Sequence, residues 1–313
     1  MTFADPGSRI VVTGATGFVG QALVAQLAAS GYDVIGISDR QEPQPATAHL
    51  LREYYCVDLT RQWPDIAPFT GLIHLAGLAA VQPSFEQPQR YLNVNSTMIT
   101  NFFEYALSTG WLGRAIIVSS GAVYGTVNQL NRGGFDECSV LAPTSPYVVS
   151  KMLVENQVDY YRRQGVDALV VRPFNHIGPR QGPGFLVPDL VRKVTDAQQG
   201  EEVTVGNLNT SRDYTDVRDI VCAYVLLLEH RNPFHITYNV CSGSAHSGWE
   251  ILGAVCNALE ISIPPVKAVS DRAIDPGVII GNAERLRSEV GWRPAICLQQ
   301  SIRDFVAETW ADD

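Results

Sequence analysis

Apolar runs separated by turn residues divide the first half of the chain into alternating strand-like and helix-like stretches. The strand-like runs are apolar at consecutive positions, which is typical of strands buried on both faces of a parallel sheet. Strands are expected at RIVVT (9–13), YDVIGIS (32–38), EYYCVD (53–58), GLIHLAG (71–77), RAIIVSS (114–120) and DALVVRPFN (167–175). Helices with apolar periodicity are expected at 18–30, 89–107 and 147–164. This order predicts an α/β fold, a Rossmann-type doubly wound parallel sheet.

The pattern becomes less regular after Asn175. HIGPRQGPGF (176–185) and the earlier loop at 41–48 hold too many turn-forming residues for regular structure. Further elements are expected as helices near 187–197, 217–229, 248–259 and 298–309, and as a short buried strand, TYNV, at 237–240. We therefore expect a Rossmann-type domain at 1–175, to which 215–243 returns. The remainder, 176–214 and 244–313, is expected to form a smaller mixed α/β lobe.

Three glycines follow the first expected strand at intervals of three residues. In VVTGATGFVGQAL they are Gly14, Gly17 and Gly20, between an expected strand and an expected helix. Glycine lets the backbone approach a pyrophosphate, and the N–H groups at a helix start offer hydrogen bonds to it. A glycine triplet alone would also suit a tight turn between strand and helix, but this context favours dinucleotide binding. The domain at 1–175 is therefore expected to bind the dinucleotide, and the smaller lobe is expected to bind the substrate.

The end of the second expected strand is where the choice between NAD and NADP should lie. A carboxylate at Asp39 would accept hydrogen bonds from the ribose hydroxyls of NAD, whereas Arg40 would pair with the 2′-phosphate of NADP. The apolar pattern of YDVIGIS places Ser38 at the strand end with Arg40 close behind, so the sequence leans slightly towards NADP. The alternative interpretation of Asp39 and Arg40 is a solvated loop pair.

Composition narrows the class of protein. The chain has 313 residues, of which 46% are apolar, enough for one large or two ordinary domains. Its formal charge of -9 argues against a nucleic-acid or anionic-membrane partner, although a few local arginines would suffice for an anionic small ligand. The six cysteines include no C-x-x-C pair and are expected to be reduced thiols, with no metal site. Neither a signal peptide nor a membrane span is expected, which favours a cytoplasmic protein.

The helix expected from Pro146 carries Tyr147 and Lys151 one turn apart, in SPYVVSKMLVE. Side chains four residues apart are neighbours on a helix, and an ammonium group beside a phenol lowers the pKa of the phenol. An unperturbed phenol, with a pKa of about 10, lies too high for proton exchange near neutral pH. Taken alone, the pair would also suit ordinary helix packing.

Eight motifs together resemble the extended short-chain dehydrogenase/reductase family, the NAD(P)-dependent sugar-nucleotide epimerases, dehydratases and reductases. The motifs run nearly from end to end of the chain: TGATGFVG, HLAG, NVNSTMIT, VSSGAVYG, SPYVVSK, RPFNHIGPRQ, RDYTDVRDI and YNVCSG. RPFNHIGPRQ with GFLVPDL looks closest to the GDP-mannose branch of this family, which holds GDP-mannose 4,6-dehydratase and GDP-6-deoxy-4-ketomannose reductase.

The resemblance implies a catalytic triad of Ser120, Tyr147 and Lys151. The hydroxyl of the family lies four residues before the tyrosine of V-Y-G, which here is Ser120 and not Ser119. In the family this hydroxyl binds the substrate carbonyl oxygen, and the tyrosine exchanges a proton with that oxygen. The lysine lowers the pKa of the tyrosine and holds the nicotinamide ribose.

The resemblance also implies a cofactor site spread along the first half of the chain. Asp58, after the third strand, would accept the adenine amino group, and the small Ala76 and Gly77 would let the adenosine pass. Asn95 resembles the asparagine that braces the helix near the site. The expected cofactor contacts are Gly14, Gly17, Phe18, Val19, Gly20, Asp39, Arg40, Asp58, Leu59, Leu75, Ala76, Gly77, Asn95, Tyr147, Lys151 and Pro173.

The residues after Ser120 bear on the reaction. Family members that are 4,6-dehydratases carry an acidic residue two positions after the catalytic hydroxyl, where this chain has Ala122. Alanine performs no acid–base chemistry, which argues against a dehydratase. Overall similarity favours an NAD(P)H-dependent reductase of a nucleotide-linked 4-keto-6-deoxy sugar, with GDP as the nucleotide. His176, in a Gly/Pro loop, is interpreted as a shape or hydrogen-bond element.

Local cations are needed if an acidic protein is to bind a nucleotide-sugar diphosphate. Arg212, in TSRDYTDV, resembles the family arginine at the diphosphate. Arg272 and Asp275, in DRAID, resemble an Arg-x-x-Glu pair that binds phosphate and ribose, although Asp has a shorter reach than Glu. Asn175 and Lys193 are further candidates for substrate binding. The alternative for each of these residues is a surface or inter-lobe ion pair, an alternative that is weaker for Arg212 than for the others.

Two alternatives to a reductase stay open. A nucleotide-sugar 4-epimerase would hold NAD tightly and consume no NADPH. A non-catalytic NAD(P)-sensing protein on the same fold would usually lack the tyrosine or the lysine that this chain keeps. A homodimer formed through the helices that begin near 89 and 147 is a further implication of the resemblance.

Overall fold

The computed structural model describes residues 7–125, 133–197, 201–269 and 277–310. Its centre is a seven-stranded sheet in the order β10-β6-β5-β4-β1-β2-β3, in which neighbouring strands run parallel. These strands are β1 (Arg9–Thr13), β2 (Asp33–Ser38), β3 (Leu51–Cys56), β4 (Gly71–His74), β5 (Arg114–Val118), β6 (Asp167–Pro173) and β10 (Thr237–Val240). Each of them was predicted from the apolar runs, with ends that differ by a few residues.

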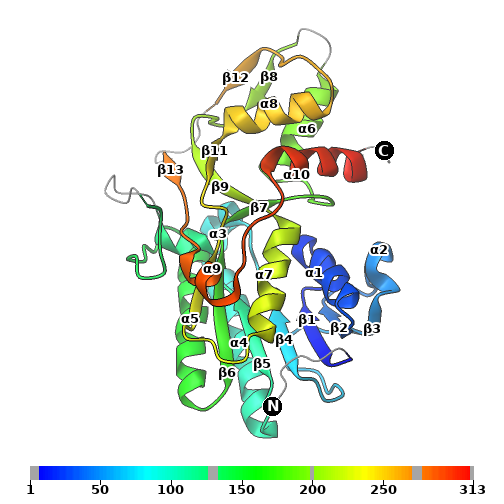
Figure 1. Cartoon of the computed structure of the whole chain (residues 1–313), viewed down its shortest axis with the longest axis vertical. Helices are drawn as coiled ribbons and strands as arrows, with labels where there is room; N and C mark the ends of the chain where they lie inside the picture. Colours follow the sequence, from blue (N-terminus) through cyan, green and yellow to red (C-terminus); the bar gives the residue numbers. More distant parts are fainter. Residues whose placement is uncertain (1–6, 126–132, 198–200, 270–276, 311–313) are drawn as a thin grey trace.

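Helices cover both faces of the sheet (Figure 1). The helices α1 and α7 pack on one face and α4 and α5 on the other; they span Phe18–Ala29, Val217–Glu229, Pro88–Thr109 and Pro146–Arg163. Successive residues of one strand serve opposite cores, because side chains alternate across a sheet. Ile10 and Val12 of β1 lie in the core with α1, and Val11 lies in the core with α4. The doubly wound Rossmann-type fold is confirmed.

Local chemistry explains where the helices that flank the site begin and end. The hydroxyl of Ser145 accepts a hydrogen bond from the Val148 N–H at 3.2 Å, which caps the start of α5. Pro146 follows at the first helical position, where its missing N–H costs little. At the end of α4, Gly110 takes the left-handed conformation, with φ of 64°.

A smaller lobe lies beyond the carboxyl ends of the sheet strands (Figure 1). Its core is formed mainly by α6, α8 and α10, with the two-stranded pair β8–β12. A second small sheet joins β7, β9, β11 and β13 between this lobe and the main sheet. These elements are α6 (Leu186–Asp196), α8 (Gly248–Ala258), α10 (Leu298–Phe305), β7 (Asn175–Ile177), β8 (Val203–Val205), β9 (Ser211–Asp216), β11 (Ala245–Ser247), β12 (Val266–Ala268) and β13 (Val278–Ile279).

The structure corrects the sequence predictions in several places. The sixth strand ends at Pro173, and the Gly/Pro segment expected to be irregular contains most of β7, which pairs with β9. The loop at 41–48 contains the short α2 (Pro45–Ala48). The elements that were not predicted include α3 (Val81–Glu86), a 3₁₀ turn η1 (Gly121–Tyr124), α9 (Glu284–Val290) and the short strands β8, β9, β11, β12 and β13. Elements this short hold too few residues to show a periodicity.

Residues at the start of α7 form ion pairs and hydrogen bonds between the Rossmann-type domain and the C-terminal segment that contains α10. Asp216 caps α7 and is ion-paired at 2.8 Å with Arg218, which also pairs with Asp304 of α10 at 2.7 Å. Asp219 accepts hydrogen bonds from two backbone N–H groups of the segment before α10. The indole N–H of Trp292 donates to the Asp219 carbonyl at 3.0 Å. These contacts hold the approach to α10 against the Rossmann-type domain.

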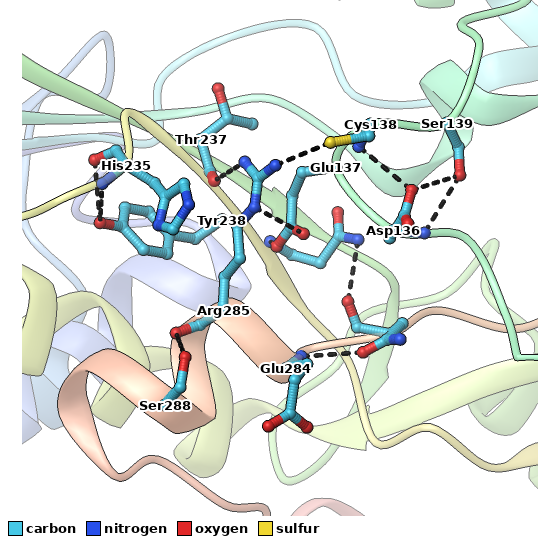
Figure 2. A network of polar contacts seen from close by, with 12 residues as sticks. Asp136, Glu137, Cys138, Ser139, His235, Thr237, Tyr238, Glu284, Arg285 and Ser288 are labelled. Atoms are coloured by element: carbon cyan, nitrogen blue, oxygen red, sulfur yellow. Dashed lines mark hydrogen bonds and ion pairs between the residues drawn. The ribbon is translucent and has the colours of Figure 1, made fainter.

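A polar network holds the segment around Glu137 against β10 and α9 (Figure 2). The Arg285 guanidinium lies between the Thr237 carbonyl, the Cys138 sulfur and the Glu137 carboxylate, at 3.4, 3.0 and 3.4 Å. The Glu137 side chain is only 2% exposed and accepts a hydrogen bond from the Asn239 N–H at 2.7 Å. Burial raises the pKa of Glu137.

Among the residues that the structure describes, none of the helices has both the length and the apolar composition needed to cross a membrane. The 22-residue α4 is amphipathic, with residues such as Phe102 buried and Arg90 and Glu104 exposed.

Candidate active site

The carboxyl ends of the central strands meet at one edge of the sheet, where a doubly wound fold binds its ligands. The turn after β1 begins with Gly14, whose φ of 69° favours glycine. A Cβ atom on Gly14 would lie 2.9 Å from the Ala76 backbone nitrogen, and one on Gly20 would lie 2.1 Å from the Gly14 carbonyl oxygen. The two glycines therefore allow the turn, the helix start and the loop after β4 to pack closely.

The residues of this turn fit a dinucleotide. Gly17 precedes the first residue of α1 and has no side chain to cap it, so the N–H groups of Phe18 and Val19 receive no side-chain cap. Such a helix start favours a pyrophosphate. The aromatic ring of Phe18 is stacked on His176 of β7, with ring centroids 6.0 Å apart and planes 13° apart. The predicted glycine-loop residues thus lie together at the sheet edge.

Ser38, Asp39 and Arg40 lie side by side at the end of β2. The buried Ser38 hydroxyl is 2.7 Å from the hydroxyl of Thr16, and it accepts a hydrogen bond from the Arg40 N–H at 3.3 Å. The side chains of Asp39 and Arg40 are both exposed. Tyr54 donates to the Arg40 carbonyl at 2.7 Å and so holds the loop. Two hydroxyls with a nearby guanidinium suit a phosphate, whereas the Asp39 carboxylate suits ribose hydroxyls.

The loop after β4 is braced from α4. The Asn95 carbonyl oxygen accepts from the Leu78 N–H at 2.8 Å, and its amide donates to Ser150 of α5 at 2.9 Å. A Cβ atom on Gly77 would lie 3.0 Å from that same Asn95 oxygen. Asn95 thus links α4, α5 and the loop, which is the bracing position that the sequence analysis expected for it.

Ser120, Tyr147 and Lys151 converge at the carboxyl end of β5. Ser120 precedes η1, and its hydroxyl accepts a hydrogen bond from the Ala122 N–H at 3.1 Å. That hydroxyl also hydrogen-bonds Tyr147 at the start of α5. Lys151, one turn along α5, donates to the Val118 carbonyl at 2.8 Å. The side chains of Tyr147 and Lys151 are both buried.

The electrostatics of Tyr147 differ from the sequence prediction. Burial raises the pKa of Tyr147, and the opposing effect comes from its hydrogen bond with Ser120. The lowering expected from Lys151 is therefore not observed. Burial lowers the pKa of Lys151 to about 8, an effect opposed by Glu155. At neutral pH the Tyr147 phenol therefore carries its proton, and the Lys151 ammonium is charged.

Other predicted cofactor residues lie around the same edge of the sheet. Leu75 follows β4 and donates its N–H to the Thr13 carbonyl at 3.2 Å, and Pro173 ends β6. Asp58 is exposed and forms an Asx turn with Thr60, with the Thr60 hydroxyl 2.6 Å from its carboxylate. These hydrogen bonds lower the pKa of Asp58. The carbonyl of the buried Leu59 accepts from Asn101 of α4 at 2.8 Å.

The predicted substrate residues are spread over the lobe. Asn175 is exposed at the start of β7, and Arg212 lies on β9 with its guanidinium 2.9 Å from the Ser211 carbonyl. Lys193 of α6 donates to the Thr204 carbonyl at 2.9 Å, which places its ammonium at β8. Arg272 and Asp275 lie outside the described residues.

Sequence reasoning gave no role to several polar side chains near the triad. His74 of β4 is buried with its Nδ1 2.9 Å from the Thr13 hydroxyl, and burial lowers its pKa to about 3. Glu155, one helical turn after Lys151, forms a largely buried ion pair with Arg172 at 2.6 Å. A histidine and an arginine within runs of buried strand residues were the available signal, because such groups are rarely buried without partners.

Residues 10–241 match the family model described as "NAD dependent epimerase/dehydratase family". The chain belongs to this family. It is an NAD(P)-dependent oxidoreductase of the extended short-chain dehydrogenase/reductase type.

Similar proteins include both reductases and epimerases. The chain is 32% identical over 305 residues to the GDP-6-deoxy-D-mannose reductase of Pseudomonas aeruginosa, in an alignment that covers 96% of each protein. It is 25% identical to a UDP-glucose 4-epimerase of Corynebacterium glutamicum, over 97% of this chain and 95% of the relative.

Solved structures similar to this chain include a UDP-glucose 4-epimerase and RMD from Pseudomonas aeruginosa. The structure of RMD from Pseudomonas aeruginosa complexed with NADPH has a TM-score of 0.83 and 29% identity, over 98% of this chain and 100% of that chain. The UDP-glucose 4-epimerase of Thermus thermophilus in complex with NAD has a TM-score of 0.83 and 28% identity, over 96% of this chain and 98% of that chain.

Proposed function

We propose that this enzyme uses NADPH to reduce the C4 ketone of a nucleotide-linked 4-keto-6-deoxy sugar, with GDP as the nucleotide. The observation that carries the proposal is Ala122, two residues after Ser120, in a chain with 32% identity to a GDP-6-deoxy-D-mannose reductase. A water elimination needs a group that moves protons at the sugar carbons, and an alanine methyl provides none. A single hydride transfer needs no such group.

The triad residues would share the work of the reduction. The hydroxyl of Ser120 donates a hydrogen bond to the C4 oxygen and stabilises the charge that develops there. Tyr147 gives its phenolic proton to that oxygen, so the ketone becomes an alcohol. The Lys151 ammonium holds the nicotinamide ribose and stabilises the phenolate that Tyr147 leaves. When bound, NADPH supplies the hydride that C4 receives.

Absorbance at 340 nm tests this proposal. The enzyme is mixed with NADPH or NADH and with GDP-4-keto-6-deoxymannose made in place by a dehydratase. Rapid loss of the reduced cofactor is the expected result. If the reduced cofactor were not consumed and NMR detected new sugar isomers, the result would instead favour the 4-epimerase. If neither occurs, the proposed sugar nucleotide is wrong.

The preference for NADPH is testable at the end of β2. Replacing Arg40 with methionine should weaken NADPH binding by about tenfold or more and leave NADH binding unchanged, because a charge-assisted hydrogen bond to the 2′-phosphate is lost. Asp39→Asn is the matched control and should change neither affinity by more than a few fold. Fluorescence titrations of the two cofactors measure this. If Asp39→Asn weakens NADH while Arg40→Met leaves NADPH unchanged, the enzyme prefers NAD.

We also propose that separate parts of the chain bind the cofactor and the nucleotide sugar. Residues 1–175, with 215–243, would hold the cofactor, and 176–214 with 244–313 would hold the nucleotide sugar. In support, β10 pairs with β6 and the apolar residues of α6, α8 and α10 form a separate core. Within 244–313, however, α9 and Trp292 pack in the core that lies between the main sheet and the helices α1 and α7. Asn175, Lys193, Arg212, Arg272 and Asp275 stay proposed substrate residues.

The outer surface of α5 supports a homodimer. Val149, Leu153 and Tyr160 are exposed apolar or aromatic residues of α5. The helix α5 itself packs beside α4 (Figure 1). Exposed apolar patches mark protein interfaces. Sedimentation at micromolar concentration should give a dimer for the wild type and a monomer for Leu153→Glu. A monomeric wild type would contradict the proposal.

A further inference from the structure

A largely buried carboxylate lies one helical turn beyond Lys151 of the proposed triad. Glu155 follows Lys151 by one turn of α5, and its side chain is 11% exposed. One of its oxygens accepts a hydrogen bond from the Ser119 hydroxyl. The same carboxylate accepts two bonds from Arg172 at the end of β6, at 2.9 Å from Nε and 2.6 Å from Nη2. Glu155 therefore joins α5, β6 and the end of β5.

Arg172 is fixed on its other side as well. Its Nη1 donates to the Tyr124 hydroxyl at 2.8 Å, and its guanidinium lies 5.0 Å from the centroid of the Tyr124 ring. Tyr124 donates in turn to the Asn239 side chain at 2.7 Å. Asn239 belongs to β10 and, through Glu137, reaches the network of Figure 2. The ion pair is thus held from α5, η1 and β10.

Stability alone gives little reason for this ion pair. A buried ion pair costs desolvation, and apolar residues of similar volume usually fill such a position as well or better. The contacts of Glu155 instead lead towards the reacting groups. Ser119 immediately precedes Ser120, and the Lys151 ammonium lies one turn away on the same helix.

We propose that Glu155, held by Arg172, is a positioning residue that fixes the Ser119–Ser120 segment after β5 and keeps a negative charge near Lys151. This inference rests on the proposed roles of Ser120 and Lys151. It does not depend on which sugar nucleotide the enzyme reduces.

The effect of the Glu155 charge on the Lys151 pKa can be measured, because the other groups around Lys151 are uncharged near neutral pH. On α5 these are Tyr147, which keeps its proton, and Glu155 itself. From β4 comes His74, which is neutral because its pKa is about 3, and β5 contributes the Val118 carbonyl. Among the described residues, Glu155 is the acidic group whose charge opposes the effect of burial on the Lys151 pKa.

The experiment measures NADPH affinity by fluorescence between about pH 6 and pH 10. Lys151 is charged below its pKa of about 8, so wild-type affinity should fall as the pH rises through that value. Replacing Glu155 with glutamine removes the negative charge, which disfavours the ammonium and lowers its pKa. The fall in affinity of the Glu155→Gln variant should therefore occur about one pH unit lower. Lys151→Met should abolish the pH dependence.

Asp167→Asn is the matched control. Asp167 begins β6 and pairs at 3.0 Å with the buried Arg114, at the opposite end of the strand from Arg172. This variant should lose thermal stability but keep the wild-type midpoint. Should Glu155→Gln not fold, the double variant with Arg172→Met takes its place, because it leaves no unpaired buried charge.

Two results would overturn the inference. If a folded Glu155→Gln variant showed the same pH midpoint of NADPH affinity as the wild type, the role of Glu155 would be structural only. A Lys151→Met variant that keeps the midpoint would remove the proposed role of Lys151 and the Glu155 inference with it. Because the assay contains no sugar, failure of the proposed GDP-sugar reduction would leave the measurement and its interpretation unaffected.

Discussion

Replacing Tyr147 with phenylalanine is expected to lower kcat by about 10²- to 10⁴-fold, the usual contribution of a positioned proton donor. The change removes only the hydroxyl, and the ring keeps its place in the core between α4 and α5. NADPH affinity and thermal stability should therefore stay close to those of the wild type. The rate of cofactor oxidation at 340 nm, measured at saturating substrate, gives kcat directly.

Tyr91→Phe makes the same chemical change on a neighbouring ring. Tyr91 of α4 meets Tyr147 edge to face, with centroids 6.5 Å apart, and its hydroxyl donates to the Ala80 carbonyl at 2.6 Å. That variant should retain most of the turnover. If Tyr147→Phe turned over substrate as fast as the wild type, Tyr147 would not be the proton donor.

Replacing Gly20 with alanine is expected to abolish cofactor binding and to destabilise the fold. The new Cβ would lie 2.1 Å from the Gly14 carbonyl oxygen and 2.8 Å from the Ala15 carbonyl carbon. Both atoms belong to the backbone of the glycine turn, which is predicted to bind the pyrophosphate, so relief of the clash must displace that turn. A loss of about 3 kcal/mol in the free energy of unfolding is expected. Urea unfolding and NADPH titration measure the two effects.

Gly253→Ala is the matched control for Gly20→Ala. Gly253 also lies within a helix, α8, but nothing lies within 4 Å of the position of its Cβ. Alanine has a higher helix propensity than glycine, so this variant should gain up to about 1 kcal/mol and bind NADPH normally. Normal NADPH binding by Gly20→Ala would show that the turn tolerates displacement and does not contact the cofactor.

The sequence was most informative where structure and chemistry depend on neighbouring residues. The buried strands, the glycine spacing from Gly14 to Gly20, and the helix start that carries Tyr147 and Lys151 all have short-range patterns. Hydrophobic runs, helix caps and i,i+4 pairs can be read within a window of a few residues. The resemblance that these motifs carry placed Ser120 correctly beside Tyr147.

Only the tertiary structure decided which distant residues meet at the site and how they affect one another. The Ser119–Glu155–Arg172 contacts join β5, α5 and β6, and the stacking of Phe18 on His176 joins the glycine turn to the lobe. The pKa of Tyr147 was predicted with the wrong sign because burial, which outweighs its neighbours there, is a property of the packed core. Sequence patterns by themselves predicted the doubly wound fold, and with the family resemblance they predicted Ser120, Tyr147 and Lys151 as the reacting groups. Packing between separate elements determines the electrostatics of these groups and the contacts that support them.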